Sequence, residues 1–119
     1  MAANLYQATC EAVRLATTVI GRYRVGAVLL DKKGKVCSTG INSFQKTHPT
    51  QKRYAVKVGM PYKEFLHAEI AALVKCRQKP TALVLARVDS KGMVMPVSPC
   101  PICKLALKEA GVFDIITIK

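Results

Sequence analysis

A histidine and a glutamate, His67 and Glu69, open the alanine-rich apolar segment HAEIAALV at residues 67–74. Side chains two positions apart do not share a face of an α-helix, unlike the ion pairs that form at spacings of three or four. The spacing is better explained if the end of a helix, rather than one of its sides, faces a site where both side chains act. The segment therefore predicts a helix whose N-terminus presents two titratable groups to a site.

A second chemical motif is the segment PCPIC at residues 99–103, which places Cys100 and Cys103 three positions apart. At this spacing two thiolates can bind one metal ion. Pro101 suits the first position of a helix, and the dipole at a helix N-terminus stabilises thiolates. A lone CxxC pair has several interpretations: a thioredoxin-type redox pair, half of a zinc site, or coincidence. A redox pair normally follows the first strand of its fold, whereas this pair lies near the C-terminus.

The two motifs make one set of metal ligands if both helix N-termini meet at a point. One imidazole and two thiolates would leave the fourth position of a zinc ion open to water, which is the pattern of a catalytic site. Zinc lowers the pKa of such a water to about 7, and Glu69 could move its protons to a leaving group. The alternatives are no metal, or a structural zinc knuckle, with Glu69 an ordinary first-turn glutamate. The fourth ligand of a knuckle would be Cys10, Cys37, Cys76 or His48.

Apolar periodicity and turn residues predict elements in the order α β β α β α β. Helices that alternate with apolar strands cover a sheet on both faces. The predicted segments are a helix at 4–20, a β-hairpin at 24–42, an irregular excursion at 43–64, a helix at 67–78, a strand at 81–88, an extended irregular segment at 93–98, a helix at 99–111 and a strand at 114–119.

Several packing expectations follow from this pattern. The strand that begins the hairpin is apolar on both faces, which predicts a central position in the sheet. The excursion at 43–64 shows no clear period; we expect one short element near 54–58 in it, since long loops are usually functional or mobile. The free cysteines Cys10, Cys37 and Cys76 are expected to be small core residues. The first helix is expected to bury Leu5, Ala8, Ala12, Leu15 and Val19.

The two motifs together resemble a known family. His67-Ala68-Glu69 followed by Pro99-Cys100-Pro101-Ile102-Cys103 is similar to the signature of the cytidine and deoxycytidylate deaminase superfamily of zinc enzymes. The helix, strand and turn between the two halves also fit that family, and the resemblance covers nearly the whole chain. It implies an α/β fold of three α/β/α layers, with a central mixed sheet and helices on both faces. It also implies a single catalytic domain over residues 1–119.

The resemblance implies a role for each motif residue. Glu69 would be the proton shuttle, and Ala68 would present its backbone N–H to the base. Gly40-Ile41-Asn42 resembles the family's G-x-N, so Asn42 would contact a sugar hydroxyl, although an asparagine there also suits a turn. The implied reaction is attack of water on C4 of cytosine, which gives uracil and releases ammonia. The implied ligands of the Zn²⁺ cofactor are His67, Cys100 and Cys103.

A net charge of +12 on 119 residues is large. It favours nucleic acid, a nucleotide phosphate or an acidic surface as a partner, or else a basic surface that maintains solubility. Five cysteines are an odd number without a framework pattern, which argues against disulfides and suits a reducing compartment. No apolar run approaches the ~18 residues of a membrane span, so we expect a soluble, cytoplasmic protein without a membrane partner. A homo-oligomer is expected by family analogy alone.

The excursion combines aromatic and basic side chains, which suit stacking and phosphate contacts with a nucleotide or a single strand of nucleic acid. Alternatively, its aromatics anchor a loop to the core while the charges face water. His48 is a candidate for a substrate or second-metal role, or an ordinary turn residue. The candidate substrate contacts of this region are Phe44, Lys46, His48, Lys52 and Arg53.

Three functions remain open at this point. The favoured one is deamination of a free nucleotide or nucleoside such as deoxycytidylate, because so short a chain has few elements to hold a polymer. The second is a cytosine or adenine deaminase of single-stranded DNA or RNA, which the charge and Ser98-Pro99-Cys100 favour. However, polynucleotide cytosine deaminases usually have a tryptophan where this chain has Val97, and tRNA adenosine deaminases a glutamate where it has Ser98. The third is a non-catalytic, zinc-stabilised nucleic-acid-binding module, against which the intact Glu69 argues.

Overall fold

A computed structural model describes residues 2–118 of the chain. Its elements in chain order are α1 (Ala2–Thr17), β1 (Arg24–Leu30), β2 (Val36–Ile41), α2 (Pro49–Lys57), α3 (Ala68–Lys75), β3 (Ala82–Val88), β4 (Val94–Met95), α4 (Pro101–Glu109) and β5 (Asp114–Thr117). No helix in the described part of the chain is long and apolar enough to cross a membrane.

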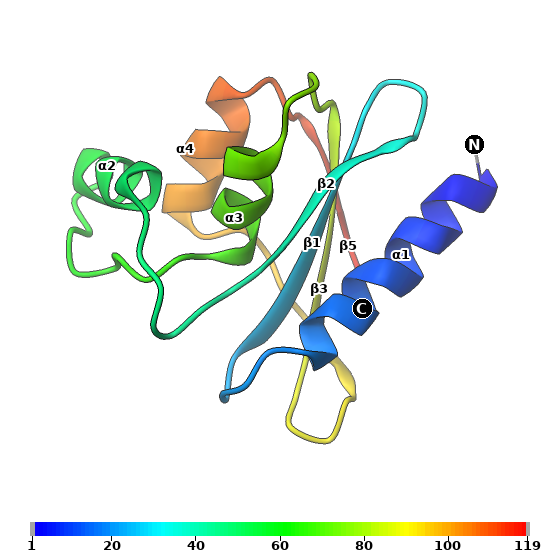
Figure 1. Cartoon of the computed structure of the whole chain (residues 1–119), viewed down its shortest axis with the longest axis horizontal. Helices are drawn as coiled ribbons and strands as arrows, with labels where there is room; N and C mark the ends of the chain where they lie inside the picture. The colour runs from blue at the N-terminus through cyan, green and yellow to red at the C-terminus, as the bar shows by residue number, and fades with distance from the viewer. Residues whose placement is uncertain (1, 119) are drawn as a thin grey trace.

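The five strands form one mixed sheet (Figure 1). β1 is flanked by antiparallel neighbours, the edge strand β2 on one side and β3 on the other. The far side of β3 is shared by two strands: β5 runs parallel to its first half, and the short β4 runs antiparallel to its last two residues. Almost every side chain of β1 and β3 is buried. The predicted central position of the strand that begins at residue 24 is therefore confirmed.

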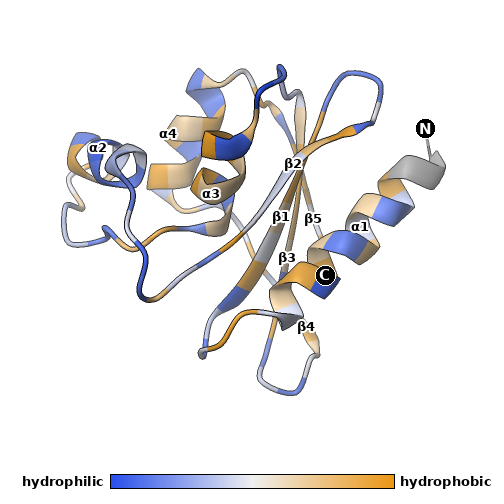
Figure 2. Cartoon of the chain, in the orientation of Figure 1, coloured by the Kyte–Doolittle hydropathy of each residue, from blue (hydrophilic) through white to orange (hydrophobic). Residues whose placement is uncertain are grey.

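Helices cover both faces of the sheet, which confirms the predicted three-layer α/β/α fold. On one face, Val28 and Leu30 of β1 pack against Ala8 and Ala12 of α1. On the opposite face, Leu29 belongs to a core cluster with residues of α3 and α4. α2 lies outside α3 and α4, on the side away from the sheet, and a third apolar cluster joins the three helices. Figure 2 shows hydrophobic residues along the central strands and hydrophilic ones in the turn between β1 and β2.

Two strand glycines allow helices to lie directly on the sheet. A Cβ on Gly26 of β1 would overlap the Ala12 carbonyl oxygen of α1. A Cβ on Gly40 of β2 would lie 2.5 Å from the Ala72 nitrogen of α3. A backbone atom cannot leave such a contact without its helix, so a larger residue would displace the whole element. Gly40 therefore sets the distance between β2 and the helix that begins next to His67.

The buried stripe of α1 differs from the prediction because close contact with the sheet requires small side chains. Leu5 is 39% exposed and Leu15 is only half-buried. The helix also ends at Thr17 rather than at residue 20. Cys10 is exposed, which corrects the expectation that it packs in the core. The residues of this segment that are buried are Ala8, Ala12, Ala16 and Val19.

The excursion at 43–64 contains a complete helix, α2, where the sequence predicts only a short element near 54–58. α2 begins earlier because His48 caps it: the Thr50 N–H donates a hydrogen bond to His48 Nδ1 at 3.1 Å. Pro49 suits the first helical position that follows this cap. The buried side chains of α2 are Gln51, Tyr54 and Ala55. A buried glutamine does not count as apolar, so it conceals the helical period.

Candidate active site and metal centre

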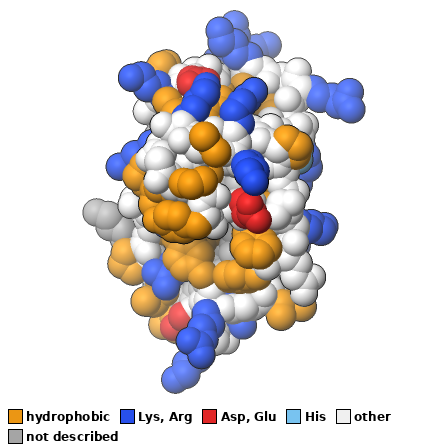
Figure 3. Space-filling model, turned by 90° about the vertical axis from the view of Figure 1, so that its left-hand side faces the viewer, with side chains coloured by type: hydrophobic (Ala, Val, Ile, Leu, Met, Phe, Trp, Pro, Cys, Tyr) orange, Lys and Arg blue, Asp and Glu red, His pale blue; other side chains and the backbone are white. Residues whose placement is uncertain are grey.

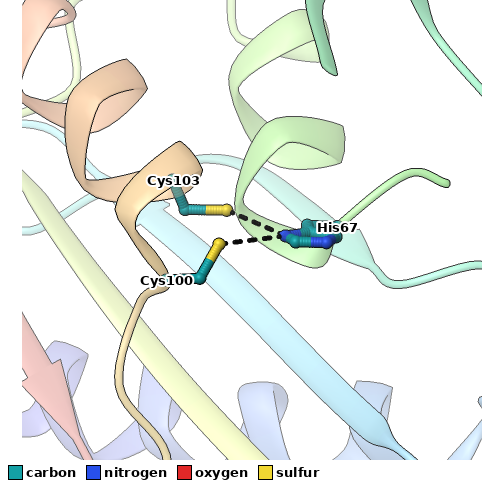
Figure 4. A group of neighbouring side chains, drawn as sticks. All are labelled: His67, Cys100 and Cys103. Atoms are coloured by element: carbon teal, nitrogen blue, oxygen red, sulfur yellow. Dashed lines mark hydrogen bonds between the residues drawn. The ribbon is translucent and has the colours of Figure 1, made fainter. Parts of the chain in front are cut away.

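The ring of His67 is free to bind a group other than its own helix. His67 is the N-cap residue of α3, with extended backbone (φ −85°, ψ 155°), but its side chain makes no capping hydrogen bond. Its Nδ1 atom faces two sulfur atoms at the start of α4 (Figure 4). The imidazole thus extends from one helix N-terminus toward another.

The two sulfur atoms belong to the PCPIC segment. Cys100 is the N-cap residue of α4, Pro101 begins the helix, and the buried Cys103 lies in its first turn. His67 Nδ1 lies 3.3 Å from Cys103 Sγ and 3.4 Å from Cys100 Sγ. The three potential ligand atoms all lie within 4.8 Å of one another. The structure therefore brings together the three residues that the sequence suggests as metal ligands.

The three side chains strongly perturb one another's proton affinity. Hydrogen bonds from Cys103 and His67 lower the pKa of the Cys100 thiol to about 3, so Cys100 is a thiolate at neutral pH. The hydrogen bond to this thiolate raises the pKa of His67. The same thiolate, together with burial, raises the pKa of Cys103. The Cys100 thiolate thus lies next to two further potential metal-ligand atoms, Nδ1 of His67 and Sγ of Cys103.

One imidazole nitrogen and two thiol sulfurs fit Zn²⁺, which binds His and Cys side chains in tetrahedral sites. Within the described residues, no fourth His, Cys, Asp or Glu joins this group. A closed structural knuckle therefore lacks its fourth ligand. Three protein ligands leave one coordination position for water or substrate, as in catalytic zinc sites. The possible fourth ligands that lie outside the group are Cys10, Cys37, Cys76 and His48.

Glu69 lies in the first turn of α3, two residues after His67, and is only 6% exposed. Burial raises the pKa of its carboxyl group above the ordinary value. A carboxyl group with a raised pKa can both accept and donate protons closer to neutral pH. Because Glu69 lines the same cleft as His67 and Cys100, it has the position and the environment of a general acid and base.

A cleft of about 500 Å³ opens onto the cluster. Its floor includes His67, Cys100 and Glu69, and its surface is mainly apolar. Lys63 is the one lysine or arginine among its described lining residues. Figure 3 shows the face of the molecule that carries α2, on which hydrophobic side chains gather near the middle while lysines and arginines lie mainly around the margin. Three aromatic lining residues are 46–72% exposed and form the mouth of the cleft: Phe44, Tyr62 and Phe65.

Asn42, at the end of β2, lines this cleft and also holds two backbone segments together. Its Oδ1 accepts a hydrogen bond from the Val25 N–H at 2.8 Å, and its Nδ2 donates one to the Tyr23 carbonyl at 2.8 Å. The amide thereby fixes the segment that enters β1 against the end of β2. Asn42 has this structural role whether or not it contacts a sugar.

Of the remaining candidate substrate contacts, two line this cleft, one lines a second cleft, and three lie on or next to α2. Ala68 and Phe44 line the cleft, and Ala68 is fully buried. Lys46 lines a different cleft of about 480 Å³. The two clefts share the lining residues Asn42, Ser43, Phe44 and Leu66.

Three candidates lie on or next to α2, and the structure does not bring them to either cleft. His48 caps the helix. The ammonium group of Lys52 lies 3.5 Å from a carboxylate oxygen of Glu64. The guanidinium group of Arg53 lies 5.0 Å from the centre of the Tyr54 ring.

Two residues beside the site are absent from the sequence-based predictions. Tyr23 lines the cleft, and the guanidinium group of Arg87 lies 4.6 Å from the centre of its ring. Gln51 is fully buried on α2 and accepts a hydrogen bond from the backbone N–H of His67. Tyr23 has a usable sequence signal, as an aromatic just before a buried strand. Gln51 has none, because a polar residue in a segment without clear period suggests exposure.

Comparison with known proteins identifies a family. The chain matches the family described as the cytidine and deoxycytidylate deaminase zinc-binding region over residues 2–119. No curated protein matches the chain.

Solved structures share the fold. Cytidine deaminase from Mycobacterium tuberculosis is 24% identical, with a TM-score of 0.59 over 97% of this chain and 84% of that one. A mutant of that enzyme has a TM-score of 0.60 at the same identity and coverage. A diaminohydroxyphosphoribosylaminopyrimidine deaminase/5-amino-6-(5-phosphoribosylamino)uracil reductase from Thermotoga maritima is 18% identical, with a TM-score of 0.57 over 97% of this chain and 29% of that one. At these identities the likeness establishes the fold alone.

Proposed function

The chain belongs to the cytidine and deoxycytidylate deaminase family, and from that premise we propose that it converts the cytosine of a free nucleoside or nucleotide to uracil. Family membership and the His-Cys-Cys cluster support a zinc-dependent hydrolytic deaminase. The observation that carries the finer proposal is the position of the buried Glu69 beside this cluster, in a cleft of about 500 Å³.

We assign the Zn²⁺ ligands to Nδ1 of His67 and the sulfur atoms of Cys100 and Cys103. Both cysteines lie at the N-terminus of α4, where the helix dipole stabilises thiolates. When bound, Zn²⁺ supplies a Lewis acid that lowers the pKa of a water molecule, which makes a nucleophile available at neutral pH.

Glu69 is the proposed general base and general acid. Its carboxylate would accept a proton from the attacking water and deliver it to the ring nitrogen N3 of cytosine. It would then transfer the second proton of the water to the exocyclic amino group. A C–O bond forms at C4, the C–N bond breaks, and ammonia leaves. Burial supports this role, because it raises the pKa of the carboxyl group and keeps bulk water from the proton path.

The cleft supports a ligand of nucleoside size. Its volume lies within the range of small-molecule sites. Aromatic side chains such as Tyr23 and Phe44 are suited to contact the flat base. We propose that the backbone N–H of Ala68 binds the base and that Asn42 binds a sugar hydroxyl. Lys63 is the cation available in the cleft for a single phosphate.

A second candidate function is deamination of cytosine or adenine in single-stranded nucleic acid. The specific observation in its favour is the exposed aromatic mouth, since aromatic side chains among positive charges stack on unpaired bases. The net charge of +12 also favours a polymer of phosphates. The apolar character of the cleft, with Lys63 as the one cation among its described lining residues, instead favours the monomer substrate.

Steady-state kinetics at two salt concentrations separate these functions. We expect the zinc-loaded protein to deaminate cytidine, deoxycytidine or their monophosphates with kcat/KM that depends weakly on salt. A polymer substrate held through many phosphates would lose affinity steeply as salt increases. Turnover of a cytosine-containing oligonucleotide alone, with a steep salt dependence, would contradict the monomer proposal.

A further inference from the structure

Gln51 is a polar side chain without exposed surface on the inner side of α2. Its neighbours on that side, Tyr54 and Ala55, pack in an apolar cluster with residues of α3 and α4, among them Cys103. Burying an amide costs free energy unless protein groups replace its hydrogen bonds to water. Gln51 must therefore be understood through its hydrogen-bond partners.

Both ends of the Gln51 amide bind the segment that leads into α3. Its Oε1 accepts a hydrogen bond from the backbone N–H of His67 at 3.2 Å. Its Nε2 donates a hydrogen bond to the carbonyl oxygen of Lys63 at 3.1 Å. One side chain thus binds the backbone at both ends of residues 63–67. This segment forms part of the cleft wall and ends at the imidazole.

The helix that carries Gln51 is itself attached to the cysteine-bearing helix. The hydroxyl group of Tyr54 donates a hydrogen bond to Glu109 at the end of α4, at 2.8 Å. The ammonium group of Lys57 lies 3.7 Å from the other carboxylate oxygen of Glu109. α2 therefore connects α4, which presents Cys100 and Cys103, to the backbone of His67. These contacts form a continuous path from one side of the metal cluster to the other.

We propose that Gln51 is a positioning residue of the zinc site, and that α2 acts as a brace that holds His67 at its distance from Cys100 and Cys103. The inference rests on the proposed ligand role of His67. Fixing the N–H of His67 fixes the direction in which its side chain leaves the backbone, and a metal site requires its ligands in place to a fraction of an ångström. The hydrogen bond to the Lys63 carbonyl likewise fixes the backbone where the wall of the substrate cleft begins.

The test compares zinc affinity in two variants. Gln51→Met keeps the length of the side chain but removes both hydrogen bonds. Ser38→Ala is the matched control: it removes a hydrogen bond of 2.6 Å from the Ser38 hydroxyl to the Ala72 carbonyl, in the same helix α3 but with no hydrogen bond to the segment that leads into His67. We expect Gln51→Met to weaken zinc binding by roughly 10- to 100-fold, as for other groups that orient metal ligands. The Ser38→Ala variant should stay within about twofold of wild type.

Zinc affinity is measured by competition with a chromophoric chelator, and the visible spectrum of the cobalt-substituted protein reports ligand geometry. Gln51→Met should shift the cobalt bands and raise the KM, whereas Ser38→Ala should lower only the thermal unfolding temperature. A folded Gln51→Met variant with wild-type zinc affinity and cobalt spectrum would overturn the proposal. Amide hydrogen exchange of the zinc-loaded wild-type protein needs no variant. We expect the backbone N–H of His67 to exchange slowly. Exchange as fast as in an unstructured peptide would also contradict the proposed role of Gln51.

The two proposals can fail separately. A wild-type protein that binds zinc but deaminates no substrate would contradict the proposed function, while the zinc affinities would still decide the role of Gln51. If the wild-type protein deaminates cytosine and the Gln51→Met variant has unchanged zinc affinity, the positioning role of Gln51 is wrong and the proposed function stands.

Discussion

Replacing Gly40 with alanine is expected to damage the active site from a distance. A Cβ at Gly40 would lie 2.5 Å from the Ala72 nitrogen and 2.9 Å from the Ala71 Cβ, both in α3. Because ordinary contacts of a Cβ lie at 3.4–4 Å, α3 would have to move away from β2 by about 1 Å to regain van der Waals distance. The N-terminus of this helix positions His67 and Glu69. A misplacement of about 1 Å costs on the order of 100-fold in rate, and overpacking costs about 1–3 kcal/mol of stability.

The assay measures kcat/KM for deamination, zinc content and thermal unfolding in parallel. Gly92→Ala provides the control, since no atom lies within 4 Å of a Cβ at Gly92 but its φ of +83° disfavours alanine. This control should lose stability while it keeps kcat/KM. If Gly40→Ala retains wild-type kcat/KM, the close contact between β2 and α3 does not position the site and the reasoning is refuted.

Further substitutions test the roles of individual groups. Glu69→Gln should bind zinc as wild type does but lose at least about 100-fold in kcat, because it cannot accept a proton; turnover within about tenfold of wild type would exclude the shuttle. Cys100→Ala should lose zinc in elemental analysis and unfold at a lower temperature, because metal binding is coupled to folding; unchanged zinc content would remove Cys100 from the site. His48→Ala should lower the free energy of unfolding by about 1 kcal/mol, measured by urea titration, through loss of the α2 cap and its bond to Thr50. The KM of His48→Ala should be unchanged, and a large increase would show that His48 contacts substrate.

The metal cluster could be anticipated from the sequence because each of its residues marks the start of a helix. A proline after Cys100 and an apolar run after His67 predict helix N-termini. That both helices lie on the same face of the sheet is shown by the structure and not by the sequence pattern. Only a few side chains at two helix N-termini can reach one metal-binding site. The chemistry of imidazole, two thiols and a carboxyl group then restricts the possible functions.

The cleft walls and the brace could not be anticipated because they depend on the tertiary path of one segment. α2 is amphipathic in the structure, but its inner side contains the buried amide of Gln51. Lys52 and Arg53 follow Gln51 in the sequence but are exposed on α2, so their charge carries no information about the cleft. In α1 the predicted burial of Ala8, Ala12 and Val19 is confirmed, whereas the predicted burial of Leu5 and Leu15 is wrong for a related reason. Close contact with Gly26 selects alanines for the buried stripe, whereas sequence periodicity gives most weight to large residues such as Leu5.

Product analysis tests the central claim most directly. The zinc-loaded protein is incubated with cytosine, cytidine, deoxycytidine, their monophosphates, a cytosine-containing single-stranded oligonucleotide, and adenine and guanine counterparts, and the products are identified by mass spectrometry. Our account predicts uracil products from a free nucleoside or nucleotide, with ammonia in equal amount, and none from a Glu69→Gln control. A protein with stoichiometric zinc that converts no amino-substituted base would contradict it.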